Sequence, residues 1–203
     1  MIRLLGPGTK HLTAVAVSGG IDSMAALSFL RRANPSIKAV YFHHGTNHGT
    51  EAETFVRDFC SRNAISLLTG RISSTKPKDR STEEYWRQER YTYLNSLDEK
   101  IVTAHHLNDV AESWVMGLIR GGHPKRIHYH LPPNVYRPFL LTTKQSLEEW
   151  CRRHNVPWIQ DPSNMDVDYD RNRIRHRILP EMLAVNPGLL RQIARSYEAD
   201  LIV

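Results

Sequence analysis

The sequence predicts an α/β protein, in which a doubly wound, Rossmann-like parallel sheet is followed by a short C-terminal helical segment. Apolar runs of strand length alternate with amphipathic patterns of helical period from residue 12 to about residue 120. The first strand is joined to the first helix by the turn Ser18-Gly19-Gly20. Because doubly wound sheets bind ligands at the carboxyl ends of their strands, this turn is the first candidate for a site.

Four strands and four helices are expected before residue 122. Short apolar runs predict the strands at residues 12–17, 37–42, 65–68 and 100–104. Apolar residues three and four apart predict a helix after each strand. Capping boxes at residues 50–53 and 81–84 mark the starts of the second and third helices, and Gly121 and Gly122 end the fourth, which covers residues 107–118.

The pattern becomes less regular after Gly122, where residues 123–133 are rich in histidine, proline and basic residues. Periodicity and turn signals then predict a strand at 136–141, a helix at 146–153, a polar loop at 161–170 and two helices at 172–184 and 187–202. We therefore expect a main domain over residues 1–170 and a C-terminal helical extension over residues 171–203.

The composition is that of a folded, soluble protein. Of the 203 residues, 40% are hydrophobic and 24% are charged, which excludes a disordered or fibrous chain. No apolar run reaches membrane-spanning length, and no signal peptide is recognised. The only cysteines, Cys60 and Cys151, lie in helical patterns, so neither a disulfide framework nor a cysteine zinc site is predicted. The expected location is the reducing cytoplasm.

The charge balance is basic, with a formal net charge of +6 at pH 7. Four arginines fall within seven residues, at Arg171, Arg173, Arg175 and Arg177. Such a segment fits a polyanionic partner, but for charge alone a solvated helix face is the better interpretation.

The six residues Ser18-Gly19-Gly20-Ile21-Asp22-Ser23 lie between a predicted strand and a predicted helix. Small residues there let backbone N–H groups approach a phosphate at the positive end of the helix, and two serine hydroxyls add donors. Asp22 is placed to help hold a Mg²⁺ ion that bridges phosphates. No lysine follows, so this is not the Gly-Lys-Ser/Thr loop, and a plain strand-to-helix turn is an equal alternative.

The same six residues resemble the SGGxDS signature of the N-type ATP pyrophosphatases, the PP-loop family, whose fold is of the adenine nucleotide alpha hydrolase kind. Further motifs are similar to those in the catalytic domain of the bacterial tRNA(Ile)-lysidine synthetases. They are Phe42-His43-His44-Gly45, residues 104–113 (A-x-H-L-D-D-Q-x-E-T in the family), Arg120-Gly121-Gly122, Arg137-Pro138, residues 158–164 (W-x-x-D-x-S-N) and residues 169–175 (Y-x-R-N-x-x-R).

The resemblance implies a two-step ligase reaction within a catalytic domain at residues 1–170. ATP adenylates the wobble cytidine of a tRNA(Ile) with a CAU anticodon, and free lysine then attacks C2 and expels AMP. The implied cofactors are ATP and Mg²⁺. The residues implied are, for ATP, Ser18, Gly19, Gly20, Ile21, Asp22, Ser23 and His43; for Mg²⁺, Asp22; for catalysis, Asp22, His106, Arg171 and Arg175; and for lysine, Asp109 and Glu112.

Several of these residues have a plainer interpretation. His43 is as well explained as a structural strand-end histidine, and spacing alone makes Asp109 and Glu112 a surface acidic pair. Arg87 and Arg90 match the family's E-x-x-x-R-x-x-R-Y helix, but an internal salt-bridged helix is slightly favoured over substrate contact.

Two departures from the family pattern keep other functions open. Asn108 replaces the first aspartate of L-D-D, and the sequence ends soon after the R-N-x-x-R motif, so its basic segments or a homodimer are expected to supply the grip on RNA. The alternatives are another PP-loop tRNA-modifying enzyme with a different nucleophile, such as a thiolase, and a nucleotide- or RNA-binding module with impaired catalysis.

Overall fold

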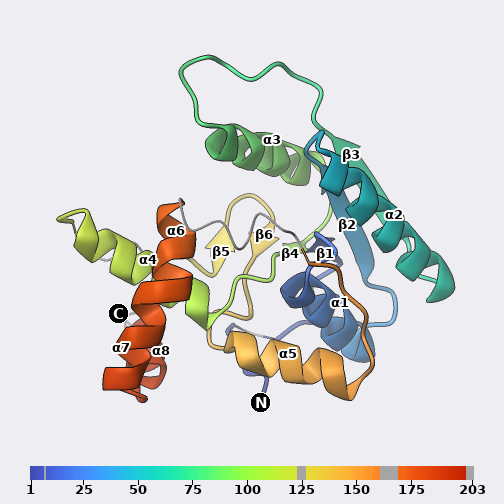
Figure 1. Cartoon of the computed structure of the whole chain (residues 1–203). Helices are drawn as coiled ribbons and strands as arrows, with labels where there is room; N and C mark the ends of the chain where they lie inside the picture. The colour runs from blue at the N-terminus through green and yellow to red at the C-terminus, as the bar shows by residue number, and fades with distance from the viewer. Residues whose placement is uncertain (7, 123–126, 161–168, 200–203) are drawn as a thin grey trace.

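A computed structural model describes residues 1–6, 8–122, 127–160 and 169–199. Its centre is a six-stranded sheet with the order β3-β2-β1-β4-β6-β5 (Figure 1). Five strands run parallel, and β5 is antiparallel to β6. The strands are β1 (Ala14–Val17), β2 (Lys38–His43), β3 (Leu67–Arg71), β4 (Ile101–Val102), β5 (His130–Leu131) and β6 (Val135–Tyr136). The predicted doubly wound α/β fold is confirmed.

Helices cover both faces of the sheet (Figure 1). Alternate strand residues point to opposite faces, so Val15 and Ala39 pack with α1, α2 and α5, whereas Ala14 and Val40 pack with α3. The helices of these layers are α1 (Ile21–Ala33), α2 (Asn47–Arg62), α3 (Thr82–Ser96) and α5 (Lys144–Arg153). Burial on both faces explains why the central strands are almost wholly apolar.

The remaining helices form a lobe beside the sheet (Figure 1). They are α4 (Leu107–Ile119), α6 (Asp170–Arg173), α7 (Leu179–Val185) and α8 (Leu189–Ala199). Leu107 and Ala111 of α4 share one apolar core with Leu179 of α7 and Ile193 of α8. This core holds the C-terminal helices against the start of α4; a domain boundary at residue 170 stays a prediction.

The strand order reverses between β1 and β4, which are neighbours in the sheet. From β1 the chain continues outward through β2 and β3, and β4 borders β6 on the other side. The segments that leave the carboxyl ends of β1 and β4 therefore flank the position where doubly wound sheets bind their ligands. These segments begin with Ser18 and Thr103.

The start of the second helix was predicted wrongly. Helix α2 begins at Asn47, and its N-cap is Thr46, whose side chain accepts from the Gly49 N–H at 2.9 Å. Tyr41 donates to the Gly49 carbonyl at 2.7 Å, and a Cβ on Gly49 would lie 3.3 Å from the His43 ring. Packing against β2 thus extends the helix by a turn that the capping box at residue 50 did not reveal.

The structure also corrects the prediction after residue 122. The strand expected at residues 136–141 ends at Tyr136, since Arg137 is followed by Pro138 and a turn in which Thr142 N–H bonds Phe139 O at 2.8 Å. The antiparallel strand β5 was not predicted. The helix expected at 172–184 is interrupted by a π-helical turn at Ile174–Ile178, just before Pro180.

Candidate functional site

The turn after β1 has a backbone shape that only glycine adopts easily. Gly19 has φ +82°, and a Cβ there would lie 3.0 Å from Ile159 Cγ1. The Ile159 N–H donates to the Gly19 carbonyl at 2.9 Å. The segment around Ile159 therefore crosses over the turn and fixes it against the body of the domain.

Ser18 and Ser23 brace this turn from within. Ser23 Oγ accepts from the Ser18 N–H at 3.0 Å and donates to the Gly20 carbonyl at 2.9 Å. Ser18 Oγ accepts from the Gly20 N–H at 3.3 Å. Gly20 is the N-cap of α1 and supplies no side-chain cap, so the first N–H groups of the helix lack the partner that a capping side chain gives. Contacts of residues 18–23 with ATP stay predictions, and we call residues 18–20 the phosphate turn after this predicted ligand.

Asp22 fits the predicted role of a magnesium ligand. Its Oδ1 atom is buried and has no hydrogen-bond partner among the described residues, and Oδ2 lies 3.5 Å from His106 Nε2. No group of three or more His, Cys, Asp or Glu that would form a metal cage occurs among those residues. Mg²⁺ often binds through one or two carboxylates together with substrate phosphates, which is the arrangement one aspartate beside a phosphate turn allows.

His106 lies buried between two carboxylates, with 3% of its side chain exposed. It is the N-cap of α4: its Nδ1 accepts from the Asp109 N–H at 3.3 Å, and Asp109 Oδ2 accepts from the His106 N–H at 2.9 Å. An Nδ1 that accepts places the proton of the neutral ring on Nε2, which faces Asp22. The cap thus aims the imidazole at the phosphate turn.

Opposing electrostatic effects act on the charges around His106. Burial alone lowers the pKa of His106, but the negative charges of Asp109, Asp22 and Glu112 outweigh it and raise the pKa above its ordinary value. Burial alone raises the pKa of Asp109, yet His106, His105 and Arg171 hold it well below its usual range. Asp109 is therefore ionised, and the neighbouring carboxylates stabilise positive charge on the His106 ring.

Asp109, Glu112, Arg171 and Arg175 form one connected group, the carboxylate–arginine quartet, in which the carboxylates are buried and the arginines partly buried. Arg171 donates to Asp109 Oδ1 at 3.0 Å and to Glu112 Oε2 at 2.9 Å. Arg175 donates to both oxygens of Glu112, at 2.6 Å and 2.9 Å. Glu112 is only 1% exposed, so the alternative of a surface acidic pair is wrong. The quartet joins α4 to the C-terminal segment.

The structure thus brings together residues predicted for different tasks. The carboxylates expected to bind lysine are in direct contact with the arginines expected to hold phosphate. Neither role is tested by this contact, and both stay predictions. Arg173 and Arg177, from the same basic segment, are exposed.

His43 is fully engaged at the end of β2. It is 3% exposed; its Nδ1 accepts from the Gly45 N–H at 2.8 Å, and its Nε2 lies 3.1 Å from Thr50 Oγ1. These contacts are those of the structural alternative, and a role in ATP binding stays a prediction. The motif residues 161–164 lie outside the described residues.

Sequence reasoning missed a second group of cations at the same edge of the sheet. Arg137, which follows β6, donates to the Tyr91 hydroxyl of α3 at 3.1 Å, and the guanidiniums of Arg87 and Arg90 lie over the Tyr91 ring. We call these four residues the arginine–tyrosine cluster. The R-x-x-R-Y and R-P motifs contained the signal, but the salt bridges expected for the helix are absent among the described residues.

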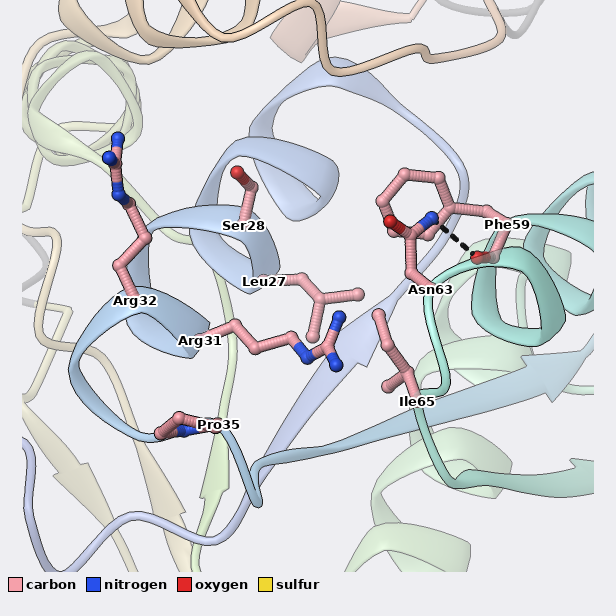
Figure 2. A pocket seen from close by; sticks show the side chains of 8 residues that line it. All are labelled: Leu27, Ser28, Arg31, Arg32, Pro35, Phe59, Asn63 and Ile65. Carbon is pink, nitrogen blue, oxygen red and sulfur yellow. Dashed lines mark hydrogen bonds between the residues drawn. The ribbon is translucent and has the colours of Figure 1, made fainter.

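Two pockets lie at the opposite edge of the sheet. The larger, of about 420 Å³, includes His11, Asn134 and Tyr136. The pocket in Figure 2, of about 340 Å³, lies where α1 and α2 end, before β2 and β3 begin, with Arg31 extending toward its Asn63 and Ile65 side. Neither pocket contains a predicted site residue.

The family model of the PP-loop domain matches residues 1–182, which is most of the chain and includes every predicted site residue. The chain belongs to the PP-loop family. The predicted family resemblance is confirmed, and the phosphate turn, His106 and the quartet all lie within the matched PP-loop region.

Curated relatives of this PP-loop chain include tRNA(Ile)-lysidine synthases. The relative from Thermotoga maritima is 37% identical over 188 residues, covering 85% of this chain and 45% of the relative. The relative from Haemophilus ducreyi is 32% identical over 192 residues, covering 90% of this chain and 44% of the relative. The chain spans about half the length of the curated relatives it matches.

Among solved structures, an NMN synthetase from Francisella tularensis is 16% identical with a TM-score of 0.49, covering 72% of this chain and 63% of that one.

In the described part of the PP-loop chain, we find no helix with the length and apolar character of a membrane span. Cys60 and Cys151 are buried free thiols, and burial raises the pKa of each to about 11.

Proposed function

We propose that this PP-loop domain carries out ATP-dependent lysidine formation: it adenylates the wobble cytidine of a tRNA(Ile) with a CAU anticodon and joins lysine to C2, releasing AMP and pyrophosphate. The observation that carries the proposal is the unpartnered Asp22 Oδ1 beside a glycine turn that opens α1. The curated relatives named tRNA(Ile)-lysidine synthase support the same assignment.

In the first step, the turn at residues 18–20 and the first N–H groups of α1 hold the triphosphate, as helix N-termini do for anions. Asp22 would hold a Mg²⁺ ion through its free oxygen, and the ion would supply positive charge to neutralise the pyrophosphate leaving group. His106 holds a proton on Nε2 beside Asp22, which fixes the direction of that carboxylate.

In the second step, the quartet must admit a lysine ammonium. Two carboxylates already face two guanidiniums, so an additional cation alone has no unpaired negative charge to bind. The phosphate of the adenylated cytidine supplies that charge: Arg171 and Arg175 turn toward it, and Asp109 and Glu112 then accept the ammonium. Lysine should therefore bind after adenylation.

The RNA contacts come from the exposed arginines of the same segment. Arg171 and Arg175 face inward to the quartet, whereas Arg173 and Arg177 are exposed and free to meet phosphodiesters. Binding that depends on such contacts weakens as salt is raised, because bound cations are released from the RNA.

The central test supplies the chain with ATP, Mg²⁺, labelled lysine and a tRNA(Ile) transcript with a CAU anticodon. We expect pyrophosphate release and label in the tRNA, located at the wobble base by digestion. Release without label would redirect the proposal to another nucleophile, and production of ADP instead of AMP would exclude it.

Asp22→Ala is the matched variant for the first step. We expect pyrophosphate release to fall about 100-fold or more, the usual cost of removing one electrostatic contact to developing charge, while the thermal unfolding temperature changes little. Arg31→Gln, at the opposite edge, is the control and should release pyrophosphate at the unaltered rate. An unaltered rate in Asp22→Ala removes the role proposed for this residue.

A further inference from the structure

The arginine–tyrosine cluster concentrates three positive charges around one side chain. The guanidinium carbon of Arg87 lies 4.9 Å from the centre of the Tyr91 ring, and that of Arg90 lies 5.3 Å from it. Arg137, which is 4% exposed, donates to the Tyr91 hydroxyl at 3.1 Å and to the His128 carbonyl at 3.0 Å. One phenol and one carbonyl thus face three cations.

No carboxylate of the described chain neutralises these cations. Glu53, Asp109 and Glu112 pair with other arginines, and none of the ion pairs among the described residues includes a guanidinium of the cluster. The buried Nε atoms of Arg90 and Arg137 have no hydrogen-bond partner among those residues. Buried charge without a counter-charge is costly, so an arrangement of this kind calls for an anion.

We propose that the arginine–tyrosine cluster is a binding site for a phosphate oxyanion, with Arg90 and Arg137 as its principal donors. The proposal rests on the proposed function for the source of the phosphate, which is either the polyphosphate of the nucleotide or a phosphodiester of the RNA. Guanidinium groups present several N–H donors in one plane and suit the oxygens of a phosphate.

The position of the cluster connects it with the candidate site. Arg137 follows the carboxyl end of β6, and β6 is the neighbour of β4, from which the chain leads to His105 and His106. An anion at Arg137 therefore lies at the same sheet edge as the phosphate turn. The exposed Arg87 marks the side of the cluster that faces solvent.

The neighbouring titratable groups respond to this uncompensated charge. Burial lowers the pKa of His44 to about 4, and Arg90 contributes to that shift. Burial lowers the pKa of His105 to about 3, with Arg137, Arg90 and Arg171 adding to it and Asp109 opposing it. Burial alone raises the pKa of Tyr91, but Arg137 and Arg90 outweigh it and lower the pKa. All three directions fit a site that is too positive without an anion.

The test uses Arg90→Met and two probes, inorganic pyrophosphate and a CAU anticodon stem-loop RNA, with binding measured by calorimetry. We expect Arg90→Met to bind one probe about tenfold more weakly or worse, the usual effect of losing a charged hydrogen-bond donor. Loss for pyrophosphate assigns the site to the nucleotide, and loss for the stem-loop assigns it to the RNA. Equal affinity of variant and parent for both probes overturns the proposal.

Thermal unfolding without ligand provides a second readout. Removing one of several unneutralised cations should leave the unfolding temperature of Arg90→Met unchanged or raise it, whereas loss of a structural contact lowers it. Arg90→Lys keeps the charge and should recover part of the affinity. Arg31→Met is the control, since Arg31 Nε is also buried without a partner but lies at the opposite edge, and it should bind both probes like the parent.

The two proposals fail separately. If lysine is not incorporated into tRNA but Arg90→Met still loses affinity for a probe, the anion site stands and the proposed function does not. If lysine is incorporated and Arg90→Met binds both probes like the parent, the proposed function stands and the anion site does not.

Discussion

Two pairs of arginines lie near the carboxyl edge of the sheet in opposite electrostatic settings. Arg171 and Arg175 contact Asp109 and Glu112 at 2.6–3.4 Å. Arg90 and Arg137 have a tyrosine and a carbonyl as neighbours, and each retains a buried Nε atom without a partner among the described residues.

The comparison separates two uses of arginines that are buried wholly or in part. In the quartet, the arginines join the C-terminal segment to α4, and their charge is neutralised within the chain. In the arginine–tyrosine cluster, the charge is available for a ligand. His105 lies between the two groups, because its pKa responds to Asp109 and Arg171 on one side and to Arg137 and Arg90 on the other.

The largest expected effect on stability comes from removing a carboxylate from the quartet. Glu112→Gln leaves two guanidiniums without their shared carboxylate, and we expect a loss of about 3 kcal/mol in the free energy of unfolding. This is the low end of the usual range, because the Arg171 side chain is 38% exposed and can turn to water. Urea denaturation without nucleotide measures it.

Asp58→Asn is the control for this prediction. Asp58 and Arg62 are 62% and 80% exposed and 3.8 Å apart, so their separation should cost no more than about 0.5 kcal/mol. A loss in Glu112→Gln no larger than in Asp58→Asn would show that the quartet contributes little to stability.

The second effect is the contribution of His105 to the pH dependence of stability. Its folded pKa of about 3 lies below the ordinary 6.5, so between these values the unfolded chain binds a proton that the folded chain does not. The free energy of unfolding therefore falls as the pH is lowered, by up to about 1.4 kcal/mol per pH unit for this one group, or roughly 1.6 kcal/mol from pH 6.5 to 5.

His105→Gln should remove the part of this slope that His105 contributes and leave the part from His44, whose folded pKa is about 4. The glutamine keeps a partner for Thr103 Oγ1, which lies 2.9 Å from His105 Nδ1. Denaturation curves at pH 5 and 6.5 for parent and variant give the difference. Asp109, whose pKa is lowered, contributes stability above about pH 3.9 and loses it only at lower pH, so the quartet does not produce this slope. Equal slopes in the two proteins contradict the assignment to His105.

The third effect tests how the cluster is held without a ligand. Tyr91→Phe removes the hydroxyl that accepts from Arg137, and we expect a loss of about 1.5 kcal/mol, as for other hydrogen bonds to charged groups. Saturating inorganic phosphate should reduce the loss, since an oxyanion replaces the missing acceptor. A loss that phosphate does not change is the contrary result.

The smallest effect concerns an arginine of the same lobe that is paired but exposed. Arg120 donates to Asp170 at 3.1 Å, and the two side chains are 61% and 71% exposed. Arg120→Gln should change the free energy of unfolding by no more than about 0.5 kcal/mol. A larger loss would show that an exposed ion pair also stabilises the chain, so that pairing and not burial explains the stabilisation by the quartet.

Much of the fold and of the site followed from local pattern. Apolar runs and helical periodicity predicted β1, α1 and α4, and glycine before a helix start marked the turn at residues 18–20, whose phosphate binding stays a prediction. The start of α2 and the strand β5 did not follow, since packing of Tyr41 and His43 on Gly49 and a pairing with β6 decide them.

By itself, the sequence determined that a doubly wound sheet would form and that its strands would deliver Asp22 and His106 to one edge, because alternation and order are properties of the chain. Only the tertiary structure decided which arginines find a carboxylate. Arg171 and Glu112 are 59 residues apart, and periodicity carries no information about contacts at that separation. The charge of each cluster is therefore set by how the helices pack, not by the motifs that supply its residues.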